Sequence, residues 1–344
     1  MEGFEMGKVK VLTARQAADL IKDGDTVTLS GFVANGIAEA LNAAAEERFL
    51  ETGHPKDLTL FWVAGTGNKD GSHADHYAHE GMVKKVIGGH FNFVPKICEM
   101  LSENKIEGYN VPQGAIAQML RDNAAHKVGT ISHVGIGTFA DPRNGGGRLS
   151  EKTKEDIVKV IELEGQEQLF YPRIPLDVAF IRGTYADELG NITLEKEMAP
   201  LDATSQAMAV HNNGGLVVVQ VERVVKAGHL DPKLVKIPGI YVDAVVECPA
   251  DDPKQSQSIN CTYDPAYAGN TQVPVSSLEP KKLDAKKIIG RRAAMELKKN
   301  VVVNLGVGVP EWVSSVAAEE GVADEMTLTV ECGPVGGVPG GGLR

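Results

Sequence analysis

Apolar runs that end at a glycine and are followed by a helical pattern recur along this 344-residue chain. The first run, in "DGDTVTLSGF" (23–32), passes through Gly31 into "IAEALNAAAEERF" (37–49). In this second stretch the apolar positions recur with the spacing of an amphipathic helix. A strand, a glycine turn and a helix in this order are typical of one unit of an α/β fold.

Further β-branched apolar runs have the same character and are typical of strands buried on both faces of a parallel sheet. These runs are "LTLFWVAGTG" (58–67), "VGTISHVGIGTF" (128–139) and "MAVHNNGGLVVVQVERVV" (208–225). Turn residues around Gly165, and around Gly190 and Asn191, are flanked by strand-like stretches and predict two hairpins. The predicted class is α/β with a mainly parallel sheet.

The pattern divides the chain into two domains and a linker. Residues 250–284 are rich in proline and polar residues and lack periodicity, so we interpret them as an interdomain linker. An N-terminal domain (1–249) precedes it, and the start of a second domain (285–344) follows. The order of elements in 17–47 returns in 293–320. We therefore expect two similar open α/β domains, the second only partly present in this chain.

Composition and charge disfavour several classes of function. The chain is 42% hydrophobic and 24% charged, as in globular proteins with room for two cores. Its formal charge of -11 disfavours nucleic acid and anionic membranes as partners. No leader pattern and no run near the ~20 apolar residues of a membrane span are found, so we expect a cytoplasmic location. The four cysteines fit neither a disulfide framework nor a metal-ligand spacing.

Glycine-rich loops and clustered histidines are weak candidates for a site. Neither "GTGNKDG" (65–71) nor "VGGVPGGG" (335–342) places a lysine before Ser or Thr, so no nucleoside-triphosphate loop is indicated. The histidines of "HADHYAH", His73, His76 and His79, would drift around an α-helix instead of converging on a metal ion. We interpret this segment as solvated and polar, and we expect no metal site.

One acidic residue, Glu331, is at a sequence position that favours a catalytic role. It closes the apolar run 326–330 and would lie at the carboxyl end of a parallel strand, where α/β sheets place their ligand sites. The glycines that follow leave space for a substrate and let backbone N–H groups point at a developing oxyanion. The alternative is a solvated acid at a strand end. The neighbouring Cys332 has no flanking base, and we interpret it as a bystander.

The segment "VECGPVGGVPGGG" (330–342) resembles the catalytic segment of family I coenzyme A transferases, and the resemblance extends along essentially the whole chain. Several long motifs follow in the family's order and are similar in particular to the single-chain acetate/propionate coenzyme A-transferases. Among them are "DGDTVTLSGFVANG" (23–36), "IEGYNVPQGAI" (106–116) and "IIGRRAAMELKKNVVVNLGVGVPEW" (288–312). The resemblance implies a pair of similar α/β domains with the active site between them.

The resemblance also implies roles for single residues. Glu331 corresponds to the nucleophile, and Gln113 corresponds to the glutamine that contacts the reacting carboxylate. Contacts with substrate and coenzyme A fall on the glycine-rich turns: Gly31, Asn35, Gly306, Gly308, Gly336 and Gly337. Coenzyme A is a substrate in this family, so no permanently bound cofactor and no metal are implied. Cys332 departs from the small or polar residue that often follows the family's glutamate.

The implied reaction is a ping-pong transfer of coenzyme A between a short-chain acyl-CoA and a carboxylate, through a glutamyl-CoA thioester. A glutamate needs no activating base, because its unperturbed pKa is about 4.3. Two alternatives stay open: an acyl-CoA hydrolase on the same scaffold, and a catalytically silent module that binds coenzyme A or carboxylates. A homo-oligomer is expected. The family's second domain continues beyond its glycine loop, so the remainder of that domain, on the same or a separate chain, is an expected partner.

Overall fold

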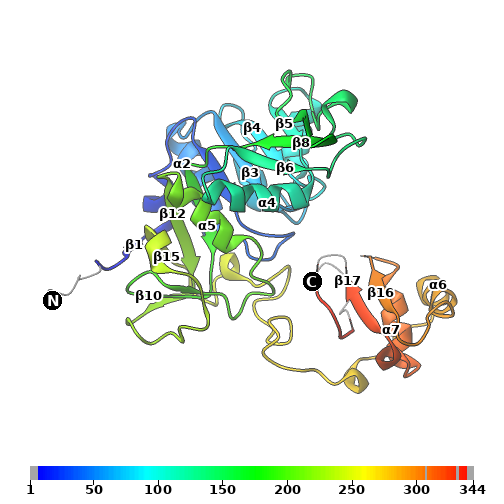
Figure 1. Cartoon of the computed structure of the whole chain (residues 1–344). Coiled ribbons are helices and arrows are strands. Elements are labelled where there is room, and N and C mark those ends of the chain that lie inside the picture. The colour runs from blue at the N-terminus through cyan, green and yellow to red at the C-terminus, as the bar shows by residue number, and fades with distance from the viewer. Residues whose placement is uncertain (1–6, 307, 331–332, 339–344) are drawn as a thin grey trace. The chain divides into compact units, whose positions relative to one another are not determined.

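A computed structural model describes residues 7–306, 308–330 and 333–338 and divides the chain into two compact units. The first unit reaches to Ala268, and the second begins at Gly269 (Figure 1). Residues 250–268, which the sequence pattern assigns to a linker, are thus counted with the first unit. The predicted domain boundaries stay a prediction.

A sheet of eight strands forms the centre of the first unit, and every pair of neighbouring strands in it is parallel. In spatial order the strands are β1 (Lys10–Leu12), β15 (Ala244–Glu247), β12 (Leu216–Val221), β9 (Val178–Arg182), β2 (Thr26–Leu29), β3 (Leu58–Trp62), β4 (Val83–Gly88) and β5 (Glu107–Asn110). All five residues of β9 are buried, as the continuous apolar pattern predicts. The predicted α/β class with a mainly parallel sheet is confirmed.

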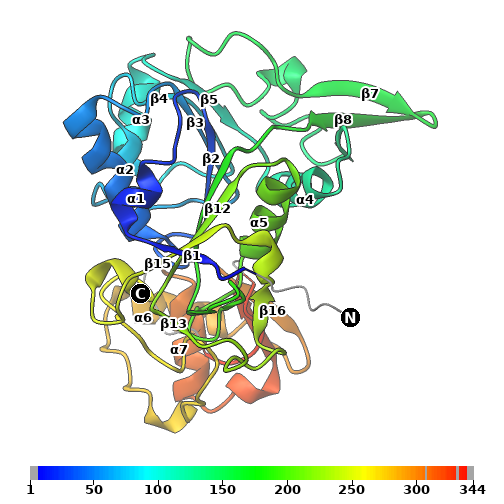
Figure 2. The same ribbon diagram turned by 90° about the vertical axis from the view of Figure 1, so that its left-hand side faces the viewer.

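Helices cover both faces of this sheet (Figure 2). Side chains of one strand alternate between the faces, so that Leu60 and Trp62 belong to one apolar core and Phe61 to the other. The first core also contains residues of α1 (Ala14–Ala18), α2 (Glu39–Thr52) and α3 (Pro95–Ser102). The second contains residues of α4 (Gln113–Ala124) and α5 (Ala203–Asn212).

A separate antiparallel sheet carries the first predicted hairpin. Its strands are β6 (Gly129–Ser132), β8 (Gln166–Pro172) and β7 (Lys159–Leu163), in that spatial order. The hairpin around Gly165 is confirmed, and Figure 2 shows it extending from the body of the unit. The prediction that 128–139 supplies a buried parallel strand is wrong. Strand β6 is antiparallel to β8, and Ile131 is 48% exposed, because only one face of this sheet is covered.

A four-stranded sheet carries the second predicted hairpin. Its spatial order is β13 (Arg223–Val225), β10 (Tyr185–Asp187), β11 (Ile192–Thr193) and β14 (Val235–Ile237). The antiparallel pairing of Ala186 with Ile192 confirms the hairpin around Gly190 and Asn191. Short 3-10 helices complete the first unit: η1 (His73–Tyr77), η2 (Pro142–Asn144), η3 (Gly239–Tyr241) and η4 (Pro253–Gln255). Among the described residues, no helix is both long enough and apolar enough to cross a membrane.

In the second unit, the described residues form one parallel pair of strands with two α-helices. Its elements in chain order are η5 (Val275–Ser277), α6 (Ala285–Ala294), β16 (Val302–Leu305), α7 (Glu311–Glu319), η6 (Ala323–Glu325) and β17 (Thr327–Val330). Leu305, Val313 and Leu328 form its buried apolar core. Val302 and Met295 are 72% and 76% exposed, so this core covers only part of the unit's apolar surface.

Candidate functional site

The turn that follows β2 is tightly held by its own backbone. Phe32 and Asn35 exchange two backbone hydrogen bonds of 2.9 Å each. A Cβ atom on Gly31 would lie 1.9 Å from Cδ1 of Ile37, and the φ of Gly31 is +123°, so both space and conformation require glycine. The turn places Asn35 at the carboxyl end of β2, on the edge where open parallel sheets bind ligands.

The loop that follows β3 is hydrogen-bonded to this turn. The N–H of Val33 donates to the carbonyl of Gly65 over 2.6 Å, and the N–H of Gly67 donates to the carbonyl of Val33 over 2.8 Å. Val33 has a φ of +55°, which a β-branched residue rarely adopts. The two loops therefore form one cross-linked and locally strained structure at the edge of the sheet.

Gln113 begins α4 at the same edge, shortly after β5. The backbone of Gly89, which follows β4, packs against it. A Cβ atom on Gly89 would lie 3.0 Å from Cβ of Gln113 and 2.2 Å from the carbonyl oxygen of Val63. The Gln113 side chain is exposed. The structure thus brings Gly31, Asn35 and Gln113 to one edge of the sheet, while their roles in binding stay a prediction.

A buried ion pair lies at the carboxyl end of β9 and was not predicted from the sequence. Nε of Arg182 lies 3.1 Å from Oε1 of Glu197, and both side chains are 3% exposed. Nη1 of Arg182 also donates to the carbonyl of Ser256. Burial raises the pKa of Glu197 although the neighbouring Arg182 opposes this shift. An arginine at the end of the apolar run "VAFIR" could have indicated a buried charge that needs a partner. No sequence pattern marks Glu197, fifteen residues later, as that partner.

A second buried side chain, Gln220 of β12, joins the start of α2 to the segment around η4. Its Oε1 accepts the N–H of Ala40 over 2.9 Å, and its Nε2 donates to the carbonyl of Lys254 over 2.9 Å. Gln255 donates in turn to the carbonyl of Gly183 over 3.3 Å. These bonds explain why the beginning of the segment interpreted as a linker packs on the first unit.

A polar cavity of about 320 Å³ lies between the glycine turn and this segment. Ala34 and Ile37 contribute from the turn, and Ser256 and Asn260 contribute from the opposite side. Its charged lining is mixed, with Arg182 and Lys254 against Glu39 and Asp70. The cavity shows that the carboxyl edge of the first unit has room for a small polar molecule.

The predicted site residues of the second unit that the structure describes lie in the segments that follow its two strands, β16 and β17. Leu305 of β16 is paired with Val330 of β17, and Gly306 directly follows the first strand. The N–H of Gly308 donates to the Glu311 carboxylate over 2.9 Å. Gly336 and Gly337 are exposed, and the N–H of Gly336 donates to the carbonyl of Leu328 over 2.7 Å. Glu331 and Cys332 lie outside the described residues.

The histidines of η1 are held by carboxylates of α2, so the interpretation as a solvated segment is wrong. Nε2 of His76 lies 2.8 Å from Glu39, its Nδ1 is hydrogen-bonded to Glu46, and Nε2 of His79 lies 2.6 Å from Glu46. His73 is only 6% exposed. The segment forms a 3-10 helix, in which residues three apart line up. Within 7–306, 308–330 and 333–338, no group of three or more His, Cys, Asp and Glu side chains could hold a metal ion.

The pKa of His76 reflects these contacts. Burial alone would lower it, but hydrogen bonds and charge from Glu39 and Glu46 outweigh burial, and the pKa is raised. Both ring nitrogens face carboxylates, which only accept hydrogen bonds, so the imidazolium is the form that satisfies both.

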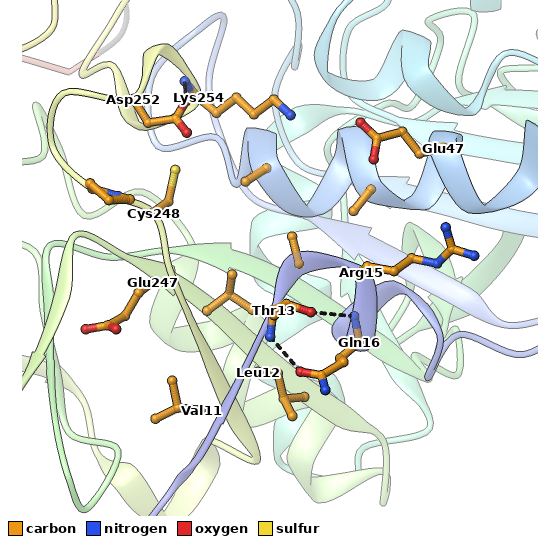
Figure 3. Close-up of a pocket in the computed structure, with 15 residues that line it drawn as sticks. Val11, Leu12, Thr13, Arg15, Gln16, Glu47, Glu247, Cys248, Asp252 and Lys254 are labelled. Carbon is orange, nitrogen blue, oxygen red and sulfur yellow. Dashed lines mark hydrogen bonds between the residues drawn. The ribbon is translucent and has the colours of Figure 1, made fainter.

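A larger cavity of about 510 Å³ lies where β1 and β15 end (Figure 3). Thr13 and Gln16 form a capping box for α1 on one wall, and Cys248 contributes from the opposite side. Burial raises the pKa of Cys248 to about 12, so its thiol is protonated at neutral pH and unsuited to act as a nucleophile. The residues assigned to the site from the sequence do not line this cavity.

The chain is similar to coenzyme A transferases in sequence. The family described as Coenzyme A transferase matches residues 11–248. The chain is 42% identical over 340 residues to the acetate CoA-transferase YdiF of Escherichia coli K12, covering 98% of this chain and 63% of that protein. It is 41% identical over 330 residues to the caffeate CoA-transferase of Acetobacterium woodii, covering 96% of this chain and 63% of that protein.

A solved structure agrees with these sequence matches. The acyl-CoA transferase YdiF of Escherichia coli O157:H7, in a thioester complex with CoA, superposes with a TM-score of 0.89 at 41% identity. The match covers 97% of this chain and 64% of the other, so the chain spans less than two thirds of the relatives' length. With its family match and its α/β fold, the chain belongs to the coenzyme A transferase family.

Proposed function

We propose that the protein transfers coenzyme A between a short-chain acyl-CoA and a carboxylate, with Glu331 as the nucleophile. The observation that carries this proposal is the 42% identity to an acetate CoA-transferase over 98% of the chain. The thioester complex with CoA of a relative 41% identical to this chain supports a covalent intermediate. Glu331 directly follows β17 in the sequence, and the last residue of β17 pairs with Leu305 at the carboxyl edge of a parallel pair of strands. This position supports Glu331 as the residue that carries the covalent intermediate.

The reaction proceeds in two exchanges at the Glu331 carboxyl group. A carboxylate oxygen of Glu331 attacks the thioester carbonyl of the acyl-CoA, the carbon–sulfur bond breaks, and an acyl anhydride and a coenzyme A thiolate result. The thiolate then attacks the glutamyl carbonyl, the donor acid leaves as a carboxylate, and a glutamyl-CoA thioester remains. The acceptor carboxylate reverses both steps. The thioester bond energy is conserved through the intermediates, so no ATP is consumed.

A carboxylate is a weak nucleophile toward a thioester, so the rate must come from donors placed around the developing oxyanion. The Gln113 amide is the donor that we assign to the reacting carbonyl. Its place at the start of α4 supports this role, because the backbone of Gly89 packs closely against Cα and Cβ of Gln113 and so holds the base of the side chain at the carboxyl edge of the sheet. We assign substrate and coenzyme A contacts to the glycine-rich turns: Gly31, Asn35, Gly306, Gly308, Gly336 and Gly337.

Chemical trapping tests the proposal. Borohydride added after acetyl-CoA should inactivate the wild-type protein by reducing the thioester on Glu331, and borohydride alone should leave it active. Glu331→Ala should abolish the exchange between acetyl-CoA and propionate. Glu331→Asp should nearly do so, because withdrawing the carboxylate by one methylene disturbs the attack geometry.

The controls distinguish the alternative functions. Equal inactivation with and without acetyl-CoA would refute the covalent mechanism. Release of free coenzyme A in the absence of propionate, at the rate of the exchange, would identify a hydrolase. Binding of acetyl-CoA without either reaction would identify a silent binding module.

We also propose that the second unit is completed by further polypeptide. Among the described residues, its sheet has only the strands β16 and β17, and Val302 on β16 is 72% exposed. Two strands and two helices bury too little apolar surface to be stable alone. The remainder of the C-terminal domain, on the same or a separate chain, would supply the missing strands and cover this surface.

A further inference from the structure

Thr66, in the loop after β3, has a buried hydroxyl group to which the described residues offer no hydrogen bond. The residue is 1% exposed, and its Oγ1 has no hydrogen-bond partner among the described residues. Oδ1 of Asn35, in the neighbouring turn, has none within the same part of the chain. The two residues are on loops that are cross-linked through Val33, whose backbone forms a bridge with that of Thr66. Two polar atoms without a partner among the described residues therefore belong to neighbouring loops at the edge of the sheet.

Such an arrangement destabilises the fold, because a buried hydroxyl loses its hydrogen bonds to water and gains none in return. The strained φ of Val33, +55°, adds to the cost at the same place. Unsatisfied polar groups and strained backbone together are typical of sites where function, instead of stability, determines the residues.

The position of Thr66 fits a role in the site. Strand β3 lies between β2 and β4 in the sheet, so the loop of Thr66 lies between the glycine turn and the loop of Gly89. Gly89 in turn packs against Gln113. Thr66 is thus in the middle of the edge that carries Asn35 on one side and Gln113 on the other.

We infer that Thr66 is a further substrate-contacting residue, whose hydroxyl donates a hydrogen bond to a carboxylate or acyl oxygen bound at this edge. The inference rests on the proposed function. A threonine hydroxyl can donate to such an oxygen, and a bond to a charged acceptor is stronger than one between neutral groups. The substrate then supplies the hydrogen-bond partner that the described part of the chain does not.

Two substitutions at Thr66 and one control separate this role from a structural one. Thr66→Val keeps the shape and removes the hydroxyl, and Thr66→Ser keeps the hydroxyl. Thr130→Val is the matched control, because Thr130 is 2% exposed and its Oγ1 already donates to Asp122 over 2.7 Å. All are made in the natural polypeptide and measured for acetyl-CoA to propionate exchange and for Tm.

The expected effects on activity and stability have opposite signs. Thr66→Val should lower kcat/KM for propionate by roughly 10- to 100-fold, the worth of one hydrogen bond to a charged group, with Tm equal or higher. Thr66→Ser should stay within about threefold of wild type in kcat/KM. Thr130→Val should lower Tm and leave exchange unchanged. Unchanged exchange in Thr66→Val, or a fall in its Tm like that of the control, would overturn the inference, the latter pointing to a buried water as the partner.

If the wild type shows no exchange, the proposed function is refuted, but the inference about Thr66 is not. A binding measurement then tests that inference separately. Saturating propionate should raise the Tm of the wild type and of Thr66→Ser, but not that of Thr66→Val. An equal rise in Thr66→Val, or no rise in the wild type, would show that Thr66 holds no carboxylate.

Discussion

Replacing Gly89 by alanine should displace Gln113 without altering its chemistry. The added Cβ would lie 2.2 Å from the carbonyl oxygen of Val63, and ordinary van der Waals contacts begin at 3.4 Å, so about 1.2 Å (3.4 − 2.2) of separation must be created. Cβ and Cα of Gln113, at 3.0 and 3.1 Å from the added atom, are also closer than an ordinary contact, so Gln113 must move as well. A displacement of about 1 Å at a catalytic group can cost roughly 10²-fold in rate. We therefore expect kcat to fall about 10²-fold, with ~1–3 kcal/mol of stability lost to overpacking.

Gly114 provides the matched control. It is the next residue after Gln113 in α4, and a Cβ there would meet nothing within 4 Å. Gly114→Ala should leave kcat unchanged and stabilise the helix by about 0.5–1 kcal/mol. Stability is measured by urea unfolding, and kcat by exchange between acetyl-CoA and propionate. Without this control, a general loss of folded protein could imitate the effect of Gly89→Ala.

A double-mutant cycle shows whether the effect passes through Gln113. Gln113→Ala alone should cost about 10²-fold in kcat, as expected for one oxyanion donor, with a smaller effect on coenzyme A affinity. In that background Gly89→Ala should cost little more, because the group that it displaces is gone. Independent, multiplying losses would refute the reasoning. So would a Gly89→Ala protein that is destabilised but turns over within threefold of wild type.

Two further predictions concern the histidine cluster and the second unit. Because Glu39 and Glu46 raise the pKa of His76, its stabilising effect should be complete below the unfolded pKa of about 6.5 and be lost as pH rises through the folded pKa, by ~1.4 kcal/mol for each unit between them. Urea unfolding at pH 6 and pH 9 should show this loss in the wild type but not in His76→Asn, and equal pH slopes in the two proteins would contradict it. Native mass spectrometry of the purified protein should show further polypeptide bound to the second unit (269–344) or continuous with it, and the same measurement reports the oligomeric state. A monomer of 36.7 kDa with full exchange activity would refute completion by further chain.

Local sequence patterns predicted the elements whose determinants lie close together in the chain. The strand and the helix around Gly31 follow from the spacing of apolar residues, and the turn between them follows from the positive φ that Gly31 adopts. The hairpin around Gly165 follows from its turn residues and strand-like flanks. In each case the deciding residues belong to elements that follow one another directly in the chain, so that a pattern in the sequence carries the information.

Pairings between distant residues could not be predicted in the same way. The run 128–139 has the apolar content of a buried strand, but its partner β8 runs antiparallel and leaves one face open. His76 looks solvated until α2, more than twenty residues earlier, supplies Glu39 and Glu46. No local sequence pattern indicates a role for Thr66. The observation that indicates one is the lack of a hydrogen-bond partner for its hydroxyl among the described residues, which only the three-dimensional structure shows.

The strand order of the central sheet has a consequence for how the chain folds during synthesis. Strands β2 to β5 are neighbours in both sequence and space, so they can pair once residue 110 has emerged. The other edge of β2 waits for β9, which ends at residue 182, about 70 residues later, or roughly 4 to 14 s at ~5–20 residues per second. During that interval β2 presents an open edge of unpaired backbone N–H and C=O groups, which could pair with another nascent chain. We expect the first unit to depend on chaperone protection at this stage, and its folding to be slow because β1 and β15 pair across almost the whole unit.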